Sequence, residues 1–299
     1  MDGPVRAADR RFDVPAARLT GVVVTSTKHK PAAHPLAREV AERFERLGVS
    51  VTLDVAGEAP LLAALELAQL VVSVGGDGTL LNAARRTVGS GVPVMGVNLG
   101  KLGFLAEFGA EQALAYASGK LEPDWPVQDK TMLQVRIAGR PGVHHALNDV
   151  MLSQGVMTRL VRVRMRVDGE HATEYRADGV VVSTPVGSTA YSLSLGGPII
   201  DHGLHALVVT PVAPHSFTNR PIVLPGHSVI GLEVLSRTDE IALVIDGQEP
   251  VPVDVGDEVL VTAAPKGLTL LSTGERSAFD VLRLKLGWGA GPAPVAEEV

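Results

Sequence analysis

The sequence predicts two domains built on different plans: an open parallel α/β sheet first, then a β-rich, sandwich-like domain. Three observations support this prediction. Short apolar strands alternate with amphipathic helices between residues 20 and 98. From residue 131 to about residue 273, helical periodicity nearly vanishes and strand patterns follow one another. Helical character returns at residues 279–287, so we expect a C-terminal helix that comes back to the first domain.

The first domain is expected to span residues 1–125, with residues 1–18 as a loose arm. Continuous apolar runs predict buried parallel strands at residues 20–25, 49–55, 70–74 and 93–98. Helices are predicted between them at residues 35–47, 59–67 and 79–88, where Pro35 suits a first helical turn and Gly48 a helix stop. Ligands of such sheets bind at the carboxyl ends of the strands, where residues 75–79 and 96–103 fall.

The second domain is expected to span residues 126–275, with its boundary at the prolines of residues 123–126. Asp168-Gly169 and Asp246-Gly247 are turn signals between its strands. Residues 276–299 are expected to form the returning helix and then a Gly/Pro/Ala/Glu-rich disordered tail. The predicted strands lie at residues 132–138, 144–153, 160–167, 180–183, 207–210, 228–234, 241–245 and 258–263.

Composition excludes several classes of protein. The chain has 299 residues, a net charge of −6 and no cysteine, which rules out disulfides, thiolate metal sites and cysteine nucleophiles. The negative charge argues against a nucleic-acid partner. Residues 1–17 lack the apolar core of a signal peptide, and the uncharged run at residues 179–200 holds too many Ser, Thr and Pro residues for a membrane span. We therefore expect a cytoplasmic protein.

The segment Gly75-Gly76-Asp77-Gly78-Thr79 joins an apolar strand to a helix. Such a turn presents backbone N–H groups at the positive end of the helix dipole, where a phosphate binds. A carboxylate in an anion site is costly unless it takes a proton or helps to hold a metal, so Asp77 points to phosphoryl transfer. No Walker lysine follows, and no Gly-x-Gly-x-x-Gly opens the first βα turn, which argues against a P-loop NTPase and a dinucleotide-binding dehydrogenase. Taken alone, the segment also fits a capped βα turn.

The chain resembles the NAD kinases. Residues 75–79 match their glycine-rich signature, which diacylglycerol-type lipid kinases and phosphofructokinases share more loosely. Further resemblances follow in order at residues 96–105, at Asn148-Asp149, at residues 178–192 and at residues 246–248. The block Thr184-Pro185-Val186-Gly187-Ser188-Thr189-Ala190-Tyr191 is specific to NAD kinases rather than lipid kinases.

The resemblance implies transfer of the γ-phosphate of ATP to the 2′-hydroxyl of the adenosine ribose of NAD, giving NADP. It implies that Asp77 is the general base, because a ribose hydroxyl must lose its proton as it attacks. Mg²⁺ is implied as cofactor, held through phosphates, and no protein ligand of the metal is assigned. The implied ATP-binding residues are Gly75, Gly76, Gly78 and Thr79. The implied NAD-binding residues are Asp77, Gly78, Phe104, Asn148, Asp149, Asp178, Thr189, Ala190, Tyr191 and Ser194.

The resemblance also implies a homodimer or homotetramer formed through the second domain, in which a neighbouring subunit can complete the pocket. Two positions depart from the family: Asp149 stands where Glu is usual, and Val186 stands where Ser or Thr is frequent. The alternatives are a lipid kinase that uses the same glycine loop and a non-catalytic sensor of NAD or NADP. The range of donors, ATP alone or polyphosphate as well, stays open.

Two further patterns are interpreted as structural. His202 and His205 have the spacing of a metal pair, but no third ligand follows at a suitable distance in the sequence. Arg162, Arg164 and Arg166 alternate with apolar residues, which predicts a basic strand face that is solvated or contacts a subunit, rather than a polyphosphate-binding stripe.

Overall fold

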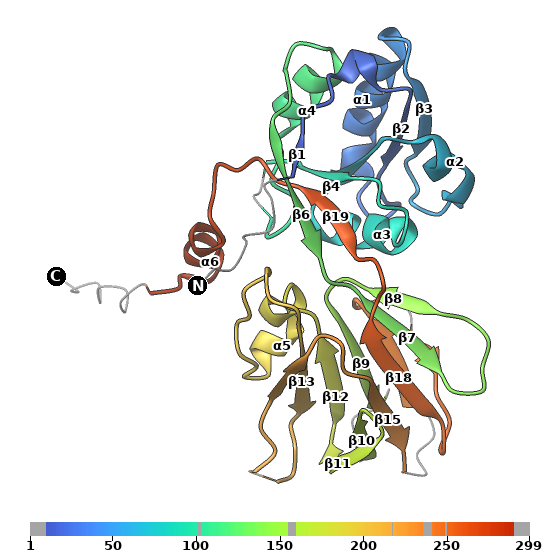
Figure 1. Cartoon of the computed structure of the whole chain (residues 1–299), viewed down its shortest axis with the longest axis vertical. Helices are drawn as coiled ribbons and strands as arrows, with labels where there is room; N and C mark the ends of the chain where they lie inside the picture. The colour runs from blue at the N-terminus through green and yellow to red at the C-terminus, as the bar shows by residue number, and fades with distance from the viewer. Residues whose placement is uncertain are drawn as a thin grey trace, which may run out of the picture.

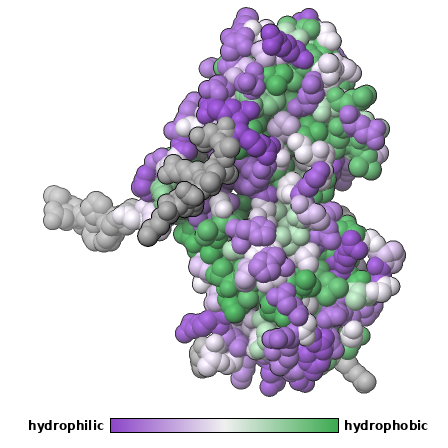
Figure 2. All heavy atoms as spheres, in the orientation of Figure 1, coloured by the Kyte–Doolittle hydropathy of each residue, from purple (hydrophilic) through white to green (hydrophobic). Residues whose placement is uncertain are grey.

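The computed structural model describes residues 10–100, 103–154, 160–216, 218–235, 241–248 and 250–289. It contains the two domains that the sequence predicts, stacked along the long axis of the molecule (Figure 1). The surface narrows where the two domains meet (Figure 2). The described helices include none with both the length and the apolar character that crossing a bilayer requires.

The first domain is a seven-stranded sheet in the order β1-β6-β19-β5-β4-β2-β3. Its four parallel strands at one side are β2 (Gly21–Thr25), β3 (Ser50–Asp54) at the edge, β4 (Leu70–Gly75) and β5 (Val94–Asn98), as predicted. Helices α1 (His34–Arg46) and α4 (Ala110–Ala117) pack on one face, and α2 (Leu62–Leu67) and α3 (Asp77–Thr87) on the other (Figure 1). Both faces of β2, β4 and β5 are therefore buried, which explains their largely apolar sequences, whereas the edge strand β3 is mostly exposed.

Two strands that were not predicted lie within the limits expected for the second domain but belong to this first sheet. β6 (Trp125–Lys130) and β19 (Leu268–Leu271) pair with each other antiparallel, and β19 also pairs with β5. The expected limits at residues 125 and 275 are therefore wrong for these strands. The chain passes from the first domain to the second after Lys130 and returns before Leu268, so two connections join the domains. Sequence patterns cannot reveal this pairing because its partners lie far apart in the chain.

Residues 10–18 are ordered and do not form the loose arm that was expected; residues 1–9 lie outside the described residues. β1 (Arg11–Phe12) pairs with β6, and a 3₁₀ helix spans Ala16–Arg18. The ring of Phe12 stacks on Trp125 with their centroids 6.1 Å apart. This aromatic contact buries Phe12 and fixes the segment to the sheet edge.

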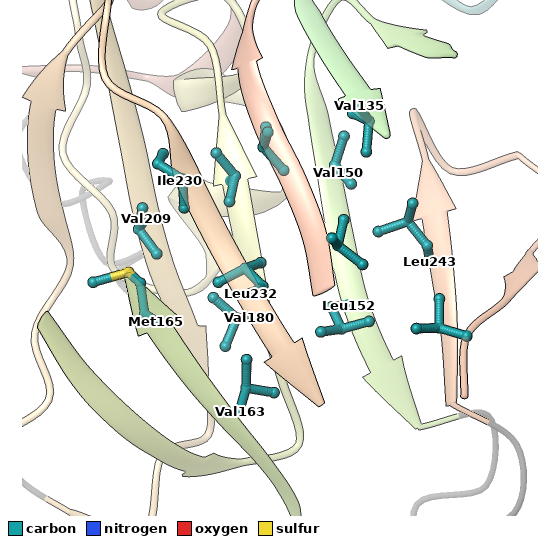
Figure 3. Close-up of a cluster of buried hydrophobic side chains, with 14 of the residues drawn as sticks. Val135, Val150, Leu152, Val163, Met165, Val180, Val209, Ile230, Leu232 and Leu243 are labelled. Atoms are coloured by element: carbon teal, nitrogen blue, oxygen red, sulfur yellow. The ribbon is translucent and has the colours of Figure 1, made fainter. Parts of the chain in front are cut away.

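The second domain is a sandwich of two six-stranded sheets, in the orders β11-β10-β15-β18-β7-β8 and β14-β13-β12-β9-β16-β17. Val163 and Leu232 of one sheet face Val180 and Leu152 of the other across the core (Figure 3). The first sheet comprises β7 (Leu133–Ile137), β8 (His144–Ala146), β10 (Val161–Val167), β11 (Glu170–Ala177), β15 (Ile230–Val234) and β18 (Glu258–Ala263). The second comprises β9 (Asp149–Gln154), β12 (Gly179–Ser183), β13 (Ala206–Val212), β14 (Ile222–Pro225), β16 (Ile241–Ile245) and β17 (Val251–Pro252).

The strand predicted over residues 144–153 is two strands in different sheets. β8 ends at Ala146 and β9 begins at Asp149, so Leu147 and Asn148 form the corner between the two sheets. β11 was not predicted, because its sequence is largely polar and it lies at a sheet edge. The arginines of β10 form ion pairs with Glu174, Glu233 and Glu258, which identifies their face as an ion-paired strand face.

Three short elements complete the fold. A 3₁₀ helix (Gly187–Thr189) and α5 (Tyr191–Ser194) follow β12, and a further 3₁₀ helix (Pro31–Ala33) precedes α1. The C-terminal helix α6 (Ala278–Leu286) is capped by Ser277 and ends at Gly287 in a left-handed conformation. It returns to the side of the first domain, where Lys285 Nζ lies 6.0 Å from the ring centre of Phe104. The expected tail from residue 290 lies outside the described residues.

Candidate active site

An open cleft of about 890 Å³ separates the two domains beside the glycine-rich loop. Its first wall comes from the loop after β2, residues 56–58, the loop of residues 76–79 and the first turns of α3. Its second wall comes from β8 and from the turn after β16. The cleft is therefore built at the carboxyl ends of β2 and β4, where the topology of a parallel sheet places ligands.

The loop of residues 75–79 has the strand–turn–helix geometry that the sequence predicts. β4 ends at Gly75, Gly76 caps the helix with φ +153°, and α3 begins at Asp77. A Cβ on Gly75 would lie 2.1 Å from Thr79 Oγ1, so only glycine fits there. The first N–H groups of a helix have no intrahelical partner, and those of α3 open into the cleft wall. This is the arrangement that binds phosphate.

The Asp77 side chain is held by three backbone N–H groups of the segment after β5. Phe104 N donates to Oδ2 at 2.7 Å, while Leu105 N and Ala106 N donate to Oδ1 at 3.1 and 3.0 Å. Gly103 makes room for this contact, because a Cβ there would lie 2.1 Å from Oδ1. The half-buried carboxylate thus has a fixed orientation in the cleft wall. Phe104, a predicted NAD contact, lies directly beside it.

Asn148 and Asp149 lie at the corner between the two sheets of the second domain. The Asn148 carbonyl accepts a hydrogen bond from Thr184 N at 2.9 Å, and a Cβ on Gly187 would lie 1.9 Å from the same oxygen. The Asp149 carboxylate accepts a hydrogen bond from the backbone N–H of Tyr191. The structure therefore brings Asn148 and Asp149 against the segment of residues 184–191.

Asp149 has a strongly perturbed pKa. Burial of its side chain and, to a smaller extent, the nearby Asp246 carboxylate raise the pKa, and the hydrogen bond from Tyr191 N–H lowers it. Together these effects raise the pKa from 3.8 to about 7. A proton on Asp149 therefore exchanges near neutral pH. Groups with perturbed pKa values concentrate at functional sites, which supports the assignment of this corner to substrate binding.

The remaining predicted contacts are divided between two places. Thr189 and Ala190 are half-buried beside Asp149, and Ser194 is exposed one helical turn further on. Tyr191 is 43% exposed, so it is not a core aromatic and its ring is available to a ligand. Asp178 lies elsewhere. Asp149 pairs with Ser183 at one end of β12, whereas Asp178 directly precedes Gly179 at the other end. At about 3.3 Å per residue, roughly 17 Å separates these two ends.

No three His, Cys, Asp or Glu side chains gather as a metal site within the described residues. His202 and His205 accordingly find no third ligand there. Burial and the charge of Lys130 together lower the pKa of His202 to about 4, against the opposing charge of Asp201.

Family comparisons cover both halves of this site. A sequence model of the ATP-NAD kinase N-terminal domain matches residues 62–124, which include Asp77 and Phe104. A model of the ATP-NAD kinase C-terminal domain matches residues 147–273, which include Asn148, Asp149 and Tyr191. The chain belongs to the NAD kinase family.

Relatives and solved structures agree with this membership. An NAD kinase of Heliobacterium modesticaldum is 38% identical over 281 residues, covering 90% of this chain and 98% of its own. One from Acidobacterium capsulatum is 42% identical over 74% of this chain and 79% of its own. Yeast NADH kinase, solved with NADH, superposes with a TM-score of 0.80 at 25% identity over 97% of both chains. An NAD kinase from Archaeoglobus fulgidus, solved with ATP, gives 0.68 at 27% identity over 89% of this chain and 98% of its own.

Three residues of this NAD kinase site were not singled out from the sequence. Lys30 Nζ donates to Gly75 O at 2.6 Å, directly beside the glycine loop. Arg85 of α3 forms an ion pair across the domain junction with Asp246, which had been noted only as part of a turn. Lys30 follows β2, and ligands of a parallel sheet bind at the carboxyl ends of its strands. Its position in the sequence could therefore have indicated a ligand contact. Arg85 and Asp246 carried no comparable signal.

Proposed function

We propose that the protein transfers the γ-phosphate of ATP to the 2′-hydroxyl of the adenosine ribose of NAD, producing NADP. The observation that carries this proposal is the fixed Asp77 carboxylate in the wall of the interdomain cleft, next to the helix N-terminus of the glycine loop. Family membership supports the reaction class. The solved structures of relatives with NADH and with ATP support the two substrates.

Asp77 accepts the proton of the attacking ribose hydroxyl in this proposal. Three backbone N–H groups orient its carboxylate and leave one of its roughly four lone-pair positions for the hydroxyl. The N–H groups of Gly76, Gly78 and Thr79 bind phosphate oxygens of ATP. Bound Mg²⁺ offsets negative charge on the transferring group. The phosphates of ATP would hold the metal, and no protein ligand is assigned to it.

The second domain provides the acceptor site in this proposal. Asn148 and Asp149 bind the adenosine part of NAD, with Thr189, Ala190, Tyr191 and Ser194 around it. Asp178 lies at the other end of β12, roughly 17 Å along the strand from the residue that pairs with Asp149. A homo-oligomer formed through the second domain would let Asp178 of one subunit serve a neighbour's pocket, and we propose that assembly. We also propose a cytoplasmic location, where both substrates are available.

The test is NADP formation from NAD and Mg-ATP, detected with an NADP-specific dehydrogenase and compared with an Asp77→Asn variant. We expect turnover in the parent protein and a loss of at least about a hundredfold in the variant, with NAD affinity retained. Equal activity in both proteins would remove Asp77 as the base. Parallel reactions with inorganic polyphosphate and with diacylglycerol micelles define the donor range and test the lipid kinase alternative. Folded protein that binds NAD but makes no product would favour the sensor.

A further inference from the structure

Lys30 is held beside the glycine loop by a braced segment. Its backbone N–H closes a turn onto Thr27 O at 3.1 Å, and its carbonyl accepts from Ala33 N at the start of the following 3₁₀ helix. Two contacts fasten the same segment to the rest of the sheet: Ser26 Oγ donates to Val74 O at 2.9 Å, and Lys28 N donates to Ala56 O at 2.9 Å. The position of the Lys30 backbone is therefore set by the fold.

The ammonium lies where β4 turns into α3. Nζ donates to Gly75 O at 2.6 Å, and a Cβ on Gly76 would lie only 3.2 Å from Nζ. An ammonium has three N–H donors, and this contact uses one of them within the described residues. Lys30 lines the interdomain cleft together with Gly76, Gly78 and Thr79. The charge therefore stands next to the backbone N–H groups at the start of α3.

The other strong cations of the cleft wall are neutralised by carboxylates. Lys28 Nζ forms an ion pair with Glu58 at 2.6 Å, and Arg85 forms one with Asp246 at 2.9 Å. Among the lysines and arginines that line the cleft in the described chain, Lys30 is the one whose hydrogen-bond partner is an uncharged carbonyl. Its charge is thus the least compensated of the three, and it is available to an anionic ligand in the cleft.

We propose that Lys30 binds the phosphate chain of the donor nucleotide and holds it against the glycine loop. This inference rests on the proposed function for the identity of the donor. The residues of the second domain that are assigned to NAD, at 148–149 and 189–194, do not line this cleft. Lys30 shares one wall of it with Gly76 and Thr79, which are assigned to ATP alone, and with Asp77 and Gly78, where donor and acceptor meet. A point charge beside helix N–H groups suits a polyphosphate, whose negative charge is spread over several oxygens.

The test measures the binding of Mg-AMP-PNP and of NAD separately by calorimetry, for the full chain and its variants. Lys30→Met removes the charge at similar length, Lys30→Gln is a second neutral variant, and Lys30→Arg keeps the charge. Lys120→Met is the matched control, because Lys120 is an exposed lysine outside the cleft. We expect Lys30→Met and Lys30→Gln to weaken AMP-PNP binding about tenfold to hundredfold with NAD binding unchanged. Lys30→Arg should recover most of the affinity, and the control should match the parent.

Three results would overturn the proposal. Unchanged AMP-PNP affinity in Lys30→Met would show that the ammonium makes no donor contact. Loss of NAD binding with unchanged AMP-PNP binding would place Lys30 in the binding site of the acceptor, NAD. Equal loss of both ligands, with no recovery in Lys30→Arg, would assign it a structural role in the loop. If the parent protein makes no NADP while AMP-PNP binding still depends on Lys30, the proposed function fails and this inference stands.

Discussion

Arg85 and Asp246 join the two domains through an ion pair in which Arg85 Nη1 lies 2.9 Å from Asp246 Oδ2. The Asp246 side chain is fully buried and that of Arg85 is 17% exposed. The same carboxylate accepts hydrogen bonds from the N–H groups of Leu147, Asn148 and Asp149, at 3.0, 2.8 and 3.3 Å. One side chain of α3 is thus connected, through one carboxylate, to the corner that carries the acceptor-binding residues.

Removing Arg85 should destabilise the protein and disturb the acceptor corner, the NAD-assigned residues 148–149 between the two sheets of the second domain. Arg85→Met leaves the Asp246 carboxylate buried without its ionic partner, and we expect the free energy of unfolding to fall by about 3 kcal/mol. NAD affinity should weaken as well, because the backbone of residues 147–149 loses its fixed acceptor. Urea unfolding and calorimetry measure the two effects. Arg46→Met, which breaks an exposed pair with Glu42, serves as control and should have little effect on either quantity. Equal stability of Arg85→Met and the control would contradict the role of the pair.

The stability of the protein should depend on the protonation of Asp149. Its carboxyl binds a proton more tightly in the folded protein, with a pKa of about 7, than in the unfolded chain, where the value is 3.8. Unfolding therefore releases a proton between about pH 4 and pH 7, and the stabilisation is lost as the pH rises through this range. The change from this group is on the order of 4 kcal/mol.

An Asp149→Asn variant isolates this effect. The fall in the free energy of unfolding between pH 5 and pH 8 should be smaller in the variant than in the parent, because the amide does not titrate. Asp178→Asn is the matched control and should keep the parental pH dependence. Identical slopes in the Asp149→Asn variant and the parent protein, measured by urea unfolding at each pH, would show that the carboxyl is not perturbed as described.

Gly103 should be essential for catalysis rather than for NAD binding. A Cβ in Gly103→Ala would lie 2.1 Å from Asp77 Oδ1, so the carboxylate must move out of its three N–H contacts. We expect kcat to fall by about a hundredfold, since a base displaced by about 1 Å loses its reach to the hydroxyl. The KM for NAD should change little. Gly109→Ala is the control, because a Cβ there meets its nearest neighbour at 4.0 Å. A Gly103→Ala enzyme with parental kcat would argue against the orientation of Asp77.

Tyr191 should contribute to NAD affinity without contributing to stability. Its ring is 43% exposed at the acceptor corner, so Tyr191→Ala removes a surface for the ligand and leaves the core intact. The KM for NAD should rise about threefold to tenfold, the amount expected from the loss of one aromatic contact. Phe279→Ala, which removes another exposed aromatic ring outside this corner, should leave the KM unchanged. Parental KM values in both variants would exclude a ligand contact of Tyr191.

Several features of the site could be predicted from the sequence because they are local. The strand before Gly75 and the helix from Asp77 follow from an apolar run, a glycine turn and a helical pattern in adjacent residues. The same holds for the turn at Asp246-Gly247, where both residues adopt the left-handed backbone that such pairs favour. Polar edge strands such as β11 escaped prediction, because their side chains show no alternation of apolar and polar residues.

The sequence by itself determined the two domain types, the glycine loop, the family and most of the residues assigned to the substrates, since each depends on residues close together in the chain. Only the tertiary structure decided which strands close the first sheet, that Lys30 reaches Gly75 and that Arg85 reaches Asp246. These contacts join residues 45 and 161 positions apart. It also decided that Asp178 lies far from Asp149. Such distances depend on how packed layers align in space, and a single sequence carries no local pattern that records that alignment.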